Sequence, residues 1–238
     1  MRPLGGARRP MASTASVVTS VTRLTPRMIR VRLGGEGLRG SAAVPGQSVK
    51  IYVPDPAGLL VGRDYTVRDA DPDQPSMDID FVLHGDGPAA NWARQVRPGQ
   101  GLEFVGPSGR YRPDPGADWH LFGGDESALP AILAMVGSLP ADALAVVYLE
   151  IADSAEEQPV SGPTRAEVHW LHRAESVPGA NTLLEDALRA APLPKGQGRI
   201  WLAGHTPTVR RIRAHLLAER GVDRRLLYVR GYWDRSGQ

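Results

Sequence analysis

The sequence predicts an antiparallel β-barrel followed by an α/β domain with a parallel sheet, and two patterns along the chain predict it. Up to about residue 113, short β-like runs are separated by glycine and proline turns, which is typical of a small antiparallel barrel. Beyond residue 117, strands alternate with helices, which is typical of a parallel sheet covered on both faces. The proline-rich stretch Arg112–Gly116 separates the two patterns. We therefore expect a disordered start at 1–14, a barrel domain at 15–113 and an α/β domain at 117–238.

The barrel is expected to contain six strands and one helix. Each strand is a short run bounded by turn clusters such as Pro45-Gly46 and Pro98-Gly99. The helix is predicted at Pro88–Gln95, where proline occupies the first helical position. The expected strands are Val17–Leu24, Met28–Leu33, Ser48–Val53, Tyr65–Arg68, Asp78–Leu83 and Gly101–Val105.

The α/β domain is expected to contain five strands with helices between them. The expected strands are Trp119–Phe122, Leu144–Ile151, Glu167–Leu171, Arg199–Ala203 and Leu226–Arg230. The expected helices are Ala128–Val136, Thr182–Ala190 and Pro207–Arg220.

Composition excludes several classes of protein. The 238 residues include no cysteine, which excludes disulfides, thiolate nucleophiles and cysteine-held metal or iron–sulfur centres. A net charge of +2 predicts no nucleic-acid partner. No apolar run approaches the roughly 18 residues of a membrane span, and the basic first residues contain no signal-peptide core. We expect a cytoplasmic protein.

The segment Arg63-Asp64-Tyr65-Thr66 carries three side chains suited to a planar, phosphorylated ligand. On a strand, Arg63 and Tyr65 point to one face, and Asp64 and Thr66 point to the other. A guanidinium can bind a phosphate through two hydrogen bonds, a phenol can lie against a heterocycle and a hydroxyl can bond a ring nitrogen. An ordinary edge strand would show the same four residues, so this pattern needs support elsewhere in the chain.

Support comes from the segment that runs from His84 to Ala89. It leaves a strand through glycines and opens a helix at Pro88. The free N–H groups of a helix start form an anion site. A pyrophosphate held between this helix start and Arg63 is a coherent hypothesis, although Gly87-Pro88 also starts helices that bind nothing.

The histidines and the acidic loop of the α/β domain give weaker signals. His169 and His172 lie three residues apart on a predicted strand and so face opposite ways, which makes a poor metal pair. We expect no metal site. The carboxylates Asp153, Glu156 and Glu157 follow the second strand of the sheet, where an acid can meet a ribose hydroxyl. A solvated loop is the competing interpretation.

Four segments occur in an order that resembles one known family. They are Arg63–Arg68, Phe81–Ala93, Gly124–Ile132 and Gly231–Trp233. Together they resemble the siderophore-interacting proteins, which are FAD-containing ferric-siderophore reductases of the ferredoxin-reductase superfamily. The matches run from about residue 13 to the C-terminus. The resemblance implies an FAD-binding barrel and an NAD(P)-binding-like α/β domain.

The resemblance also implies roles for individual residues. Arg63 would bind the FAD phosphates, Tyr65 would lie against the isoalloxazine ring and Thr66 would lie near its polar edge. The cofactor-binding residues implied are Arg63, Tyr65, Thr66, Val67, His84, Gly87, Pro88, Ala89, Asp125, Ser127, Ala128, Tyr232 and Trp233. Helix capping is a second interpretation of Asp125 and Ser127.

Three cations are candidates for attracting an anionic siderophore: Lys50, Arg110 and Arg235. A solvated strand lysine is an equally good interpretation of Lys50. The chain also departs from the family, because His205 stands where an acid is usual and few residues follow Trp233. We expect His205 to be an exposed turn histidine.

The resemblance implies a reductase that passes electrons from NADH, NADPH or a reduced ferredoxin through FAD to a ferric siderophore, releasing ferrous iron. The flavin carries the chemistry, so no catalytic side chain is expected. The substitution at position 205 keeps a second hypothesis open, a flavoenzyme that acts on an organic metabolite or on free flavin. A third hypothesis is a siderophore-binding protein without catalytic activity.

Overall fold

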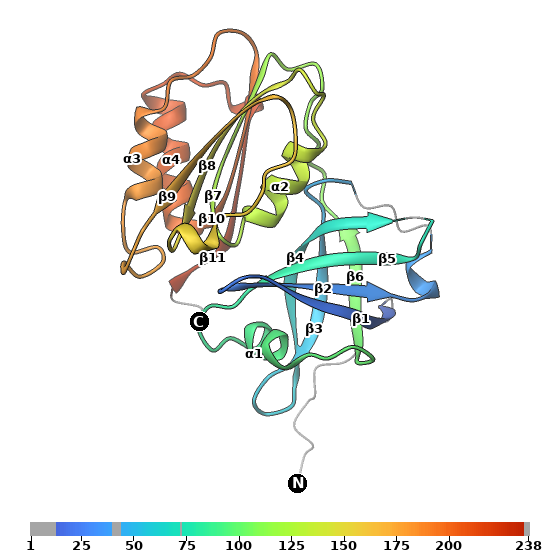
Figure 1. The fold of residues 1–238 in the computed structure, drawn as a ribbon. Coiled ribbons are helices and arrows are strands. Elements are labelled where there is room, and N and C mark those ends of the chain that lie inside the picture. Colours follow the sequence, from blue (N-terminus) through green and yellow to red (C-terminus); the bar gives the residue numbers. More distant parts are fainter. Residues whose placement is uncertain (1–12, 40–43, 72, 236–238) are drawn as a thin grey trace, which may run out of the picture. The chain divides into compact units, whose positions relative to one another are not determined.

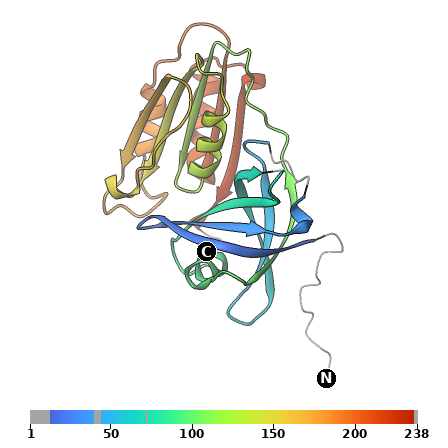
Figure 2. The same ribbon diagram turned by 45° about the vertical axis from the view of Figure 1, so that its right-hand side comes forward.

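The computed structural model describes residues 13–39, 44–71 and 73–235, and Figures 1 and 2 show it from two directions. The chain divides into two compact units between Arg110 and Tyr111, each with a hydrophobic core of its own. Most of the expected disordered start, residues 1–12, lies outside the described residues, and Thr14 already begins the first strand. The domain limits 15–113 and 117–238 stay predictions.

The first unit is a closed barrel in the strand order β1-β2-β5-β4-β3-β6. All neighbouring strands are antiparallel, which confirms the predicted barrel. Its elements are β1 (Thr14–Thr25), β2 (Met28–Gly34), η1 (Glu36–Leu38), β3 (Ser48–Pro54), β4 (Leu60–Asp71), β5 (Ser76–Val82), α1 (Pro88–Gln95) and β6 (Gly101–Ser108). β4 is 12 residues long, much longer than the predicted Tyr65–Arg68. Its ends lack a long hydrophobic run, but their backbones pair with β3 and β5.

Side chains along β2 alternate between the barrel core and the outer face, where the arginines lie. Val31 is fully buried in the core, and its neighbours Arg30 and Arg32 therefore point outward. Arg30 donates two hydrogen bonds to Asp80, at 2.7 and 2.8 Å. Arg32 donates two to Asp78 at the same distances. Both carboxylates on β5 are buried, so the two arginines neutralise them between neighbouring strands.

The second unit is a five-stranded sheet in the order β11-β10-β7-β8-β9. All its pairs are parallel, which confirms the predicted α/β domain. Its elements are β7 (Trp119–Asp125), α2 (Leu129–Gly137), β8 (Leu144–Ile151), η2 (Ser154–Glu156), β9 (Arg165–His172), α3 (Leu183–Ala190), β10 (Gly198–His205), α4 (Thr206–Ala218), η3 (Arg224–Leu226) and β11 (Leu227–Trp233).

Helices cover both faces of this sheet. α2 lies on one face, and α3 and α4 lie together on the other (Figures 1 and 2). Leu188 of α3 and Ile212 of α4 share a core with Leu121 and Leu202 of the sheet. Over the described ranges, no helix is long and apolar enough to cross a membrane.

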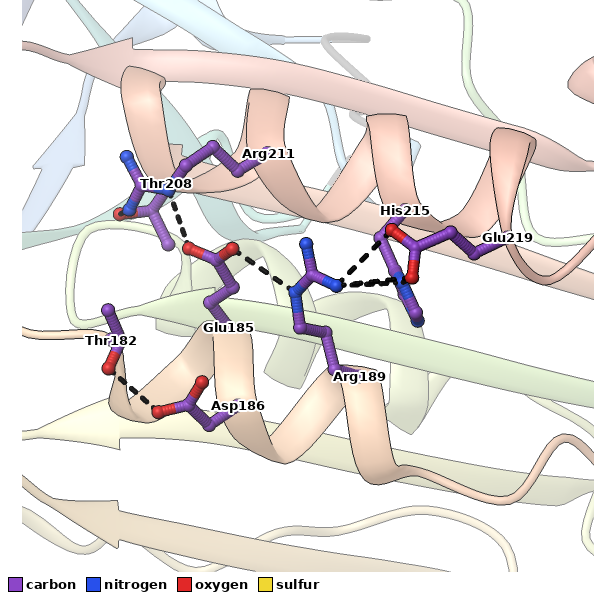
Figure 3. A network of polar contacts seen from close by, with 8 residues as sticks. All are labelled: Thr182, Glu185, Asp186, Arg189, Thr208, Arg211, His215 and Glu219. Carbon is purple, nitrogen blue, oxygen red and sulfur yellow. Dashed lines mark hydrogen bonds and ion pairs between the residues drawn. The ribbon is translucent and has the colours of Figure 1, made fainter.

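A polar network joins α3 to α4 (Figure 3). Glu185 of α3 is buried and accepts hydrogen bonds from Arg211 Nε at 2.5 Å and Arg189 Nε at 3.3 Å. Arg189 also reaches His215 Nδ1 at 3.0 Å and Glu219 at 3.3 Å. The network fixes the helix pair behind the sheet, so its role is structural.

Candidate functional site

The register between β3 and β4 decides which side chains share a face. Tyr65 is opposite Val49, and Asp64 is opposite Lys50. Residues directly opposite each other in an antiparallel pair lie on the same face. Val49 is fully buried in the barrel core, so Tyr65 is on the core side, and Lys50 and Asp64 are on the outer side. Lys50 Nζ lies 3.9 Å from Asp64 Oδ1, with both side chains about half exposed.

Arg63 shares the face of Tyr65 but remains in solvent. It is opposite the buried Ile51, and its own side chain is exposed. Nη1 donates to the backbone carbonyl of Gly62 at 2.9 Å. The structure thus brings the predicted phosphate ligand and the predicted ring contact onto one face of β4. It places the predicted siderophore contact, Lys50, on the other face.

Tyr65 begins a row of aromatic rings that runs from β4 to α1. Its ring centroid lies 4.4 Å from that of Phe81, and Phe81 lies 5.4 Å from Trp92 of α1. Burial raises the pKa of the Tyr65 phenol to about 12, so the hydroxyl stays protonated at neutral pH. Packing against Phe81 holds Tyr65 as a rigid aromatic surface.

The next two predicted residues are buried on opposite faces of β4, Val67 on the core side with Tyr65 and Thr66 on the side of Asp64. Thr66 and Val67 are both buried, and Val67 belongs to the core. The backbone N–H of Val67 donates to the carbonyl of Gln47 at 2.9 Å. The side chain of Val67 is therefore committed to packing, and only Thr66 offers a polar group.

The start of α1 has the form of an anion site. His84 is exposed after β5, and Gly87 is the N-cap residue, with no side-chain cap and Pro88 at the first helical position. The N–H of Asn91 makes the helical bond to Gly87 at 2.9 Å, so the N–H of Ala89 before it has no acceptor within the helix. A Cβ on Gly87 would meet no atom within 4 Å, so the approach to these N–H groups is open.

These barrel features fit the two parts of FAD that the sequence predicts. An exposed guanidinium and an open helix start suit a pyrophosphate. The rigid face of Tyr65 suits a planar ring.

At the carboxyl edge of the second unit, the predicted residues gather around Asp125. The strand order reverses between β7 and β10, which is where ligands bind in open α/β sheets. Asp125 ends β7 and accepts from Ser127 through N–H at 2.9 Å and Oγ at 2.5 Å. It also accepts from the His205 N–H at 2.7 Å and from the Trp233 indole at 2.9 Å. The neighbouring Ala128 is fully buried.

His205 is not the exposed turn histidine that we expect from the sequence. It is 6% exposed, and its Nδ1 lies 2.9 Å from Thr208 Oγ1. Burial is the largest influence on its pKa and lowers it. The turn after β10 enters α4 at once, and this places the ring inside the unit rather than in solvent.

The C-terminal aromatic pair ends the edge strand β11. The Tyr232 ring lies edge-on to Trp201, with 6.3 Å between centroids, and the guanidinium carbon of Arg230 lies 5.9 Å from the Tyr232 centroid. Arg235 follows in an exposed position. Arg110 is exposed at the end of the barrel unit.

Sequence reasoning misses a set of buried charges at the same edge. Glu126 is paired with Arg173, and Glu150 of β8 accepts from Asn181 at 3.1 Å. All three charged residues are buried, and burial raises the pKa of both carboxyl groups. The sequence position of Glu126 and Glu150 could have indicated their place in the site. Each comes at the end of a hydrophobic strand that leads to the edge where the strand order reverses.

The acidic loop after β8 is partly buried, contrary to the solvated interpretation. Glu156 is 3% exposed, Asp153 accepts from the Ala155 N–H at 2.9 Å, and Glu157 lies 2.9 Å from His172. His169 stacks on Tyr148, 4.5 Å between centroids. Among the described residues, no three His, Cys, Asp or Glu side chains form a metal site.

Comparison with known proteins gives the class and then the family. The distant structure of the cytochrome P450 reductase GcoB from Amycolatopsis has the same fold, with a TM-score of 0.78 at 17% identity over 100% of this chain and 74% of that one. This similarity shows the class of fold alone, a β-barrel unit followed by a parallel α/β unit. Residues 57–111 match the model of the siderophore-interacting FAD-binding domain, and residues 117–236 match that of the siderophore-interacting proteins.

Two relatives cover nearly the whole chain. The ferric vibriobactin reductase ViuB of Vibrio cholerae is 33% identical over 90% of this chain and 86% of its own length. A siderophore utilization protein from T. fusca is 37% identical, with a TM-score of 0.89 over 98% of this chain and 97% of that one. The chain belongs to the siderophore-interacting protein family and carries that family's FAD-binding domain.

Proposed function

We propose that the protein is an FAD-dependent ferric-siderophore reductase, which takes electrons from NADH, NADPH or a reduced ferredoxin and releases Fe(II) from the chelate. The observation that carries the proposal is the combination of Arg63 and Tyr65 on one face of β4 with an open helix start at Gly87. The similarity to ViuB, whose name describes a ferric siderophore reductase, supports the choice of substrate.

In this proposal the barrel residues hold and orient the cofactor. Arg63 and the first N–H groups of α1 bind the two phosphates, with Gly87 leaving room for them. Tyr65, fixed by Phe81, lies against the ring, and Thr66 offers a hydroxyl to its polar edge. Bound FAD supplies the conversion between a donor of paired electrons and an acceptor of single electrons.

The reduction itself needs no iron ligand from the protein. Ferric iron is held tightly by hard oxygen ligands, and ferrous iron is held less well, so one electron loosens the complex. We propose that Lys50, Arg110 and Arg235 provide the positive charge that attracts an anionic chelate. All three are exposed or half exposed, and surface cations of this kind act mainly on the rate of encounter.

The test is acceptor choice. The purified protein, reduced without oxygen, should be reoxidised rapidly by a ferric siderophore and slowly by organic metabolites or free flavin. Fast reoxidation by an organic acceptor alone would favour the second hypothesis drawn from the sequence. Tight siderophore binding with no reoxidation would favour a binding protein. The same reduction step, run with NADH, NADPH and reduced ferredoxin, identifies the donor. The cytoplasmic location stays a prediction.

A further inference from the structure

The carboxylate of Asp125 is enclosed by hydrogen-bond donors from three strands or their extensions. Oδ1 accepts from the Ser127 N–H and hydroxyl, at 2.9 and 2.5 Å. Oδ2 accepts from the His205 N–H of β10 at 2.7 Å and from the Trp233 Nε1–H of β11 at 2.9 Å. Asp125 is 6% exposed. A carboxylate with four donors of this kind has its hydrogen-bonding capacity satisfied by its own chain.

The backbone of β10 is shaped to admit this carboxylate. Gly204 has a φ of +130°, and a Cβ there would lie 2.5 Å from Asp125 Oδ2. Only glycine tolerates both the conformation and the approach. On the β7 side, a Cβ on Gly124 would lie 2.6 Å from the Ala203 carbonyl oxygen. Two glycines thus allow Asp125 to reach across from β7 to β10.

A second contact holds the indole from the side. The His205 ring lies 4.6 Å from the Trp233 ring and is itself tied to Thr208 of α4. A Cβ on Gly179 would lie 2.8 Å from the His205 ring, so the loop before α3 closes over the histidine. Trp233 is therefore located by a hydrogen bond at its nitrogen and by a ring contact on its surface.

We propose that Asp125 is a positioning residue, which fixes the Trp233 indole at the carboxyl edge of the sheet with His205 as its second support. The consequence for electron transfer rests on the proposed function: a fixed indole presents the same aromatic surface to whatever binds at this edge of the sheet in every turnover.

The positioning is tested without any cofactor. The chain has five tryptophans, so ¹⁵N-indole spectra give five resolvable N–H signals, and Trp233→Phe identifies the one from Trp233. In the unmodified protein we expect this N–H to exchange with water at least about tenfold more slowly than an exposed indole. Asp125→Asn should shift the signal and speed its exchange, with the other four signals unchanged as a check on folding. Ser127→Ala, which removes a donor from Oδ1 only, is the matched control.

Fast exchange of the Trp233 indole in the unmodified protein would overturn the proposal, and this result needs no variant that risks misfolding. An unchanged Trp233 signal in Asp125→Asn would overturn it as well. The role in electron transfer has a separate readout. Asp125→Asn should change kcat for siderophore reduction with FAD content retained. If the indole moves while kcat and KM stay constant, the positioning holds and the proposed place of Trp233 in the reaction fails.

Discussion

Glu126 and Arg173 form a buried ion pair at the carboxyl edge of the parallel sheet, while the nearby Glu150 has the Asn181 amide as its hydrogen-bond partner. Both carboxyl groups have a raised pKa because of burial. They differ in what their removal leaves behind, since Glu126 is in direct ion-pair contact with the buried Arg173, whereas Arg173 acts on Glu150 only through its charge.

The two carboxylates should therefore respond in opposite ways to neutralisation. Glu126→Gln leaves Arg173 buried without its counter-charge and should reduce the free energy of unfolding by about 3 kcal/mol. Glu150→Gln keeps an oxygen for Asn181 and should be at least as stable as the unmodified protein at pH 8. Urea unfolding of both variants measures the difference. Equal losses in the two would contradict this account of the pair.

Glu150 also predicts a pH dependence. Its folded pKa is above the ordinary 4.5, so the folded state binds more protons than the unfolded state between the two values. Stability from this group is present below pH 4.5 and is lost as pH rises through the raised pKa. Glu150→Gln should reduce that loss, measured as the urea midpoint between pH 4.5 and 8. An identical slope in the variant would show that Glu150 is not responsible.

For His205 we expect stability to change with pH in the opposite direction. Its folded pKa is below the ordinary 6.5 because the ring is buried, so its contribution is complete above pH 6.5 and is lost as pH falls through the lowered value. The charged groups that act on the ring are Asp125 and Asp234, which oppose the shift, and Arg211 and Arg235, which add to it. In His205→Gln, the fall in melting temperature between pH 7.5 and 5.5 should be smaller. An equal fall in the variant would show that His205 does not cause it.

Removing a buried carboxylate from the barrel should lower the free energy of unfolding strongly. The Asp80 side chain is fully buried and the Arg30 side chain is 27% exposed. Asp80→Ala should lower the free energy of unfolding by about 3 kcal/mol. This is the lower end of the cost of breaking a buried ion pair, because Arg30 is partly exposed and remains hydrated. Glu36→Ala, in the exposed pair with Arg39, should produce no measurable change. A small effect at Asp80 would mean that the two β5 carboxylates are not held by the arginines.

The barrel site predicts selective loss of FAD. Arg63→Ala should remove a phosphate contact worth about 1.5–3 kcal/mol, which raises the FAD dissociation constant roughly 10- to 150-fold. Tyr65→Ala should weaken FAD as well, although some of its effect will come from lost packing on Phe81. Lys50→Ala is the control, because Lys50 lies on the opposite face of the strand. Unchanged FAD affinity in Arg63→Ala and Tyr65→Ala would overturn the assignment.

Much of the fold could be predicted because its signals are local. Hydrophobic runs such as Leu144–Ile151 and the Pro88 helix start coincide with β8 and α1 at both ends. The long β4 could not, since residues such as Leu60–Asp64 become a strand only through pairing with β3. The buried position of His205 likewise depends on a ring contact with Trp233, which is remote in sequence, and on the side-chain contact with the nearby Thr208.

The site could be predicted where one segment supplies several groups, as Arg63 and Tyr65 do. It could not be predicted where distant segments meet. The bond between Asp125 and Trp233 joins residues 108 apart in sequence, and the pair of Glu126 with Arg173 joins β7 to the end of β9. Helix capping, the second interpretation of Asp125 and Ser127, accounts for the bonds from Ser127 to the carboxylate. It does not account for the bonds from His205 and Trp233.

If FAD in this chain reduces a ferric siderophore, the iron that it releases can be counted. The protein is loaded with FAD, reduced completely without oxygen, separated from the reductant and mixed with excess ferric siderophore in the presence of a ferrous-iron chelator. Because a reduced flavin holds two electrons and each ferric ion takes one, we expect about two Fe(II) per FAD. Reduced FAD that persists in the mixture, with no Fe(II) trapped, would contradict it.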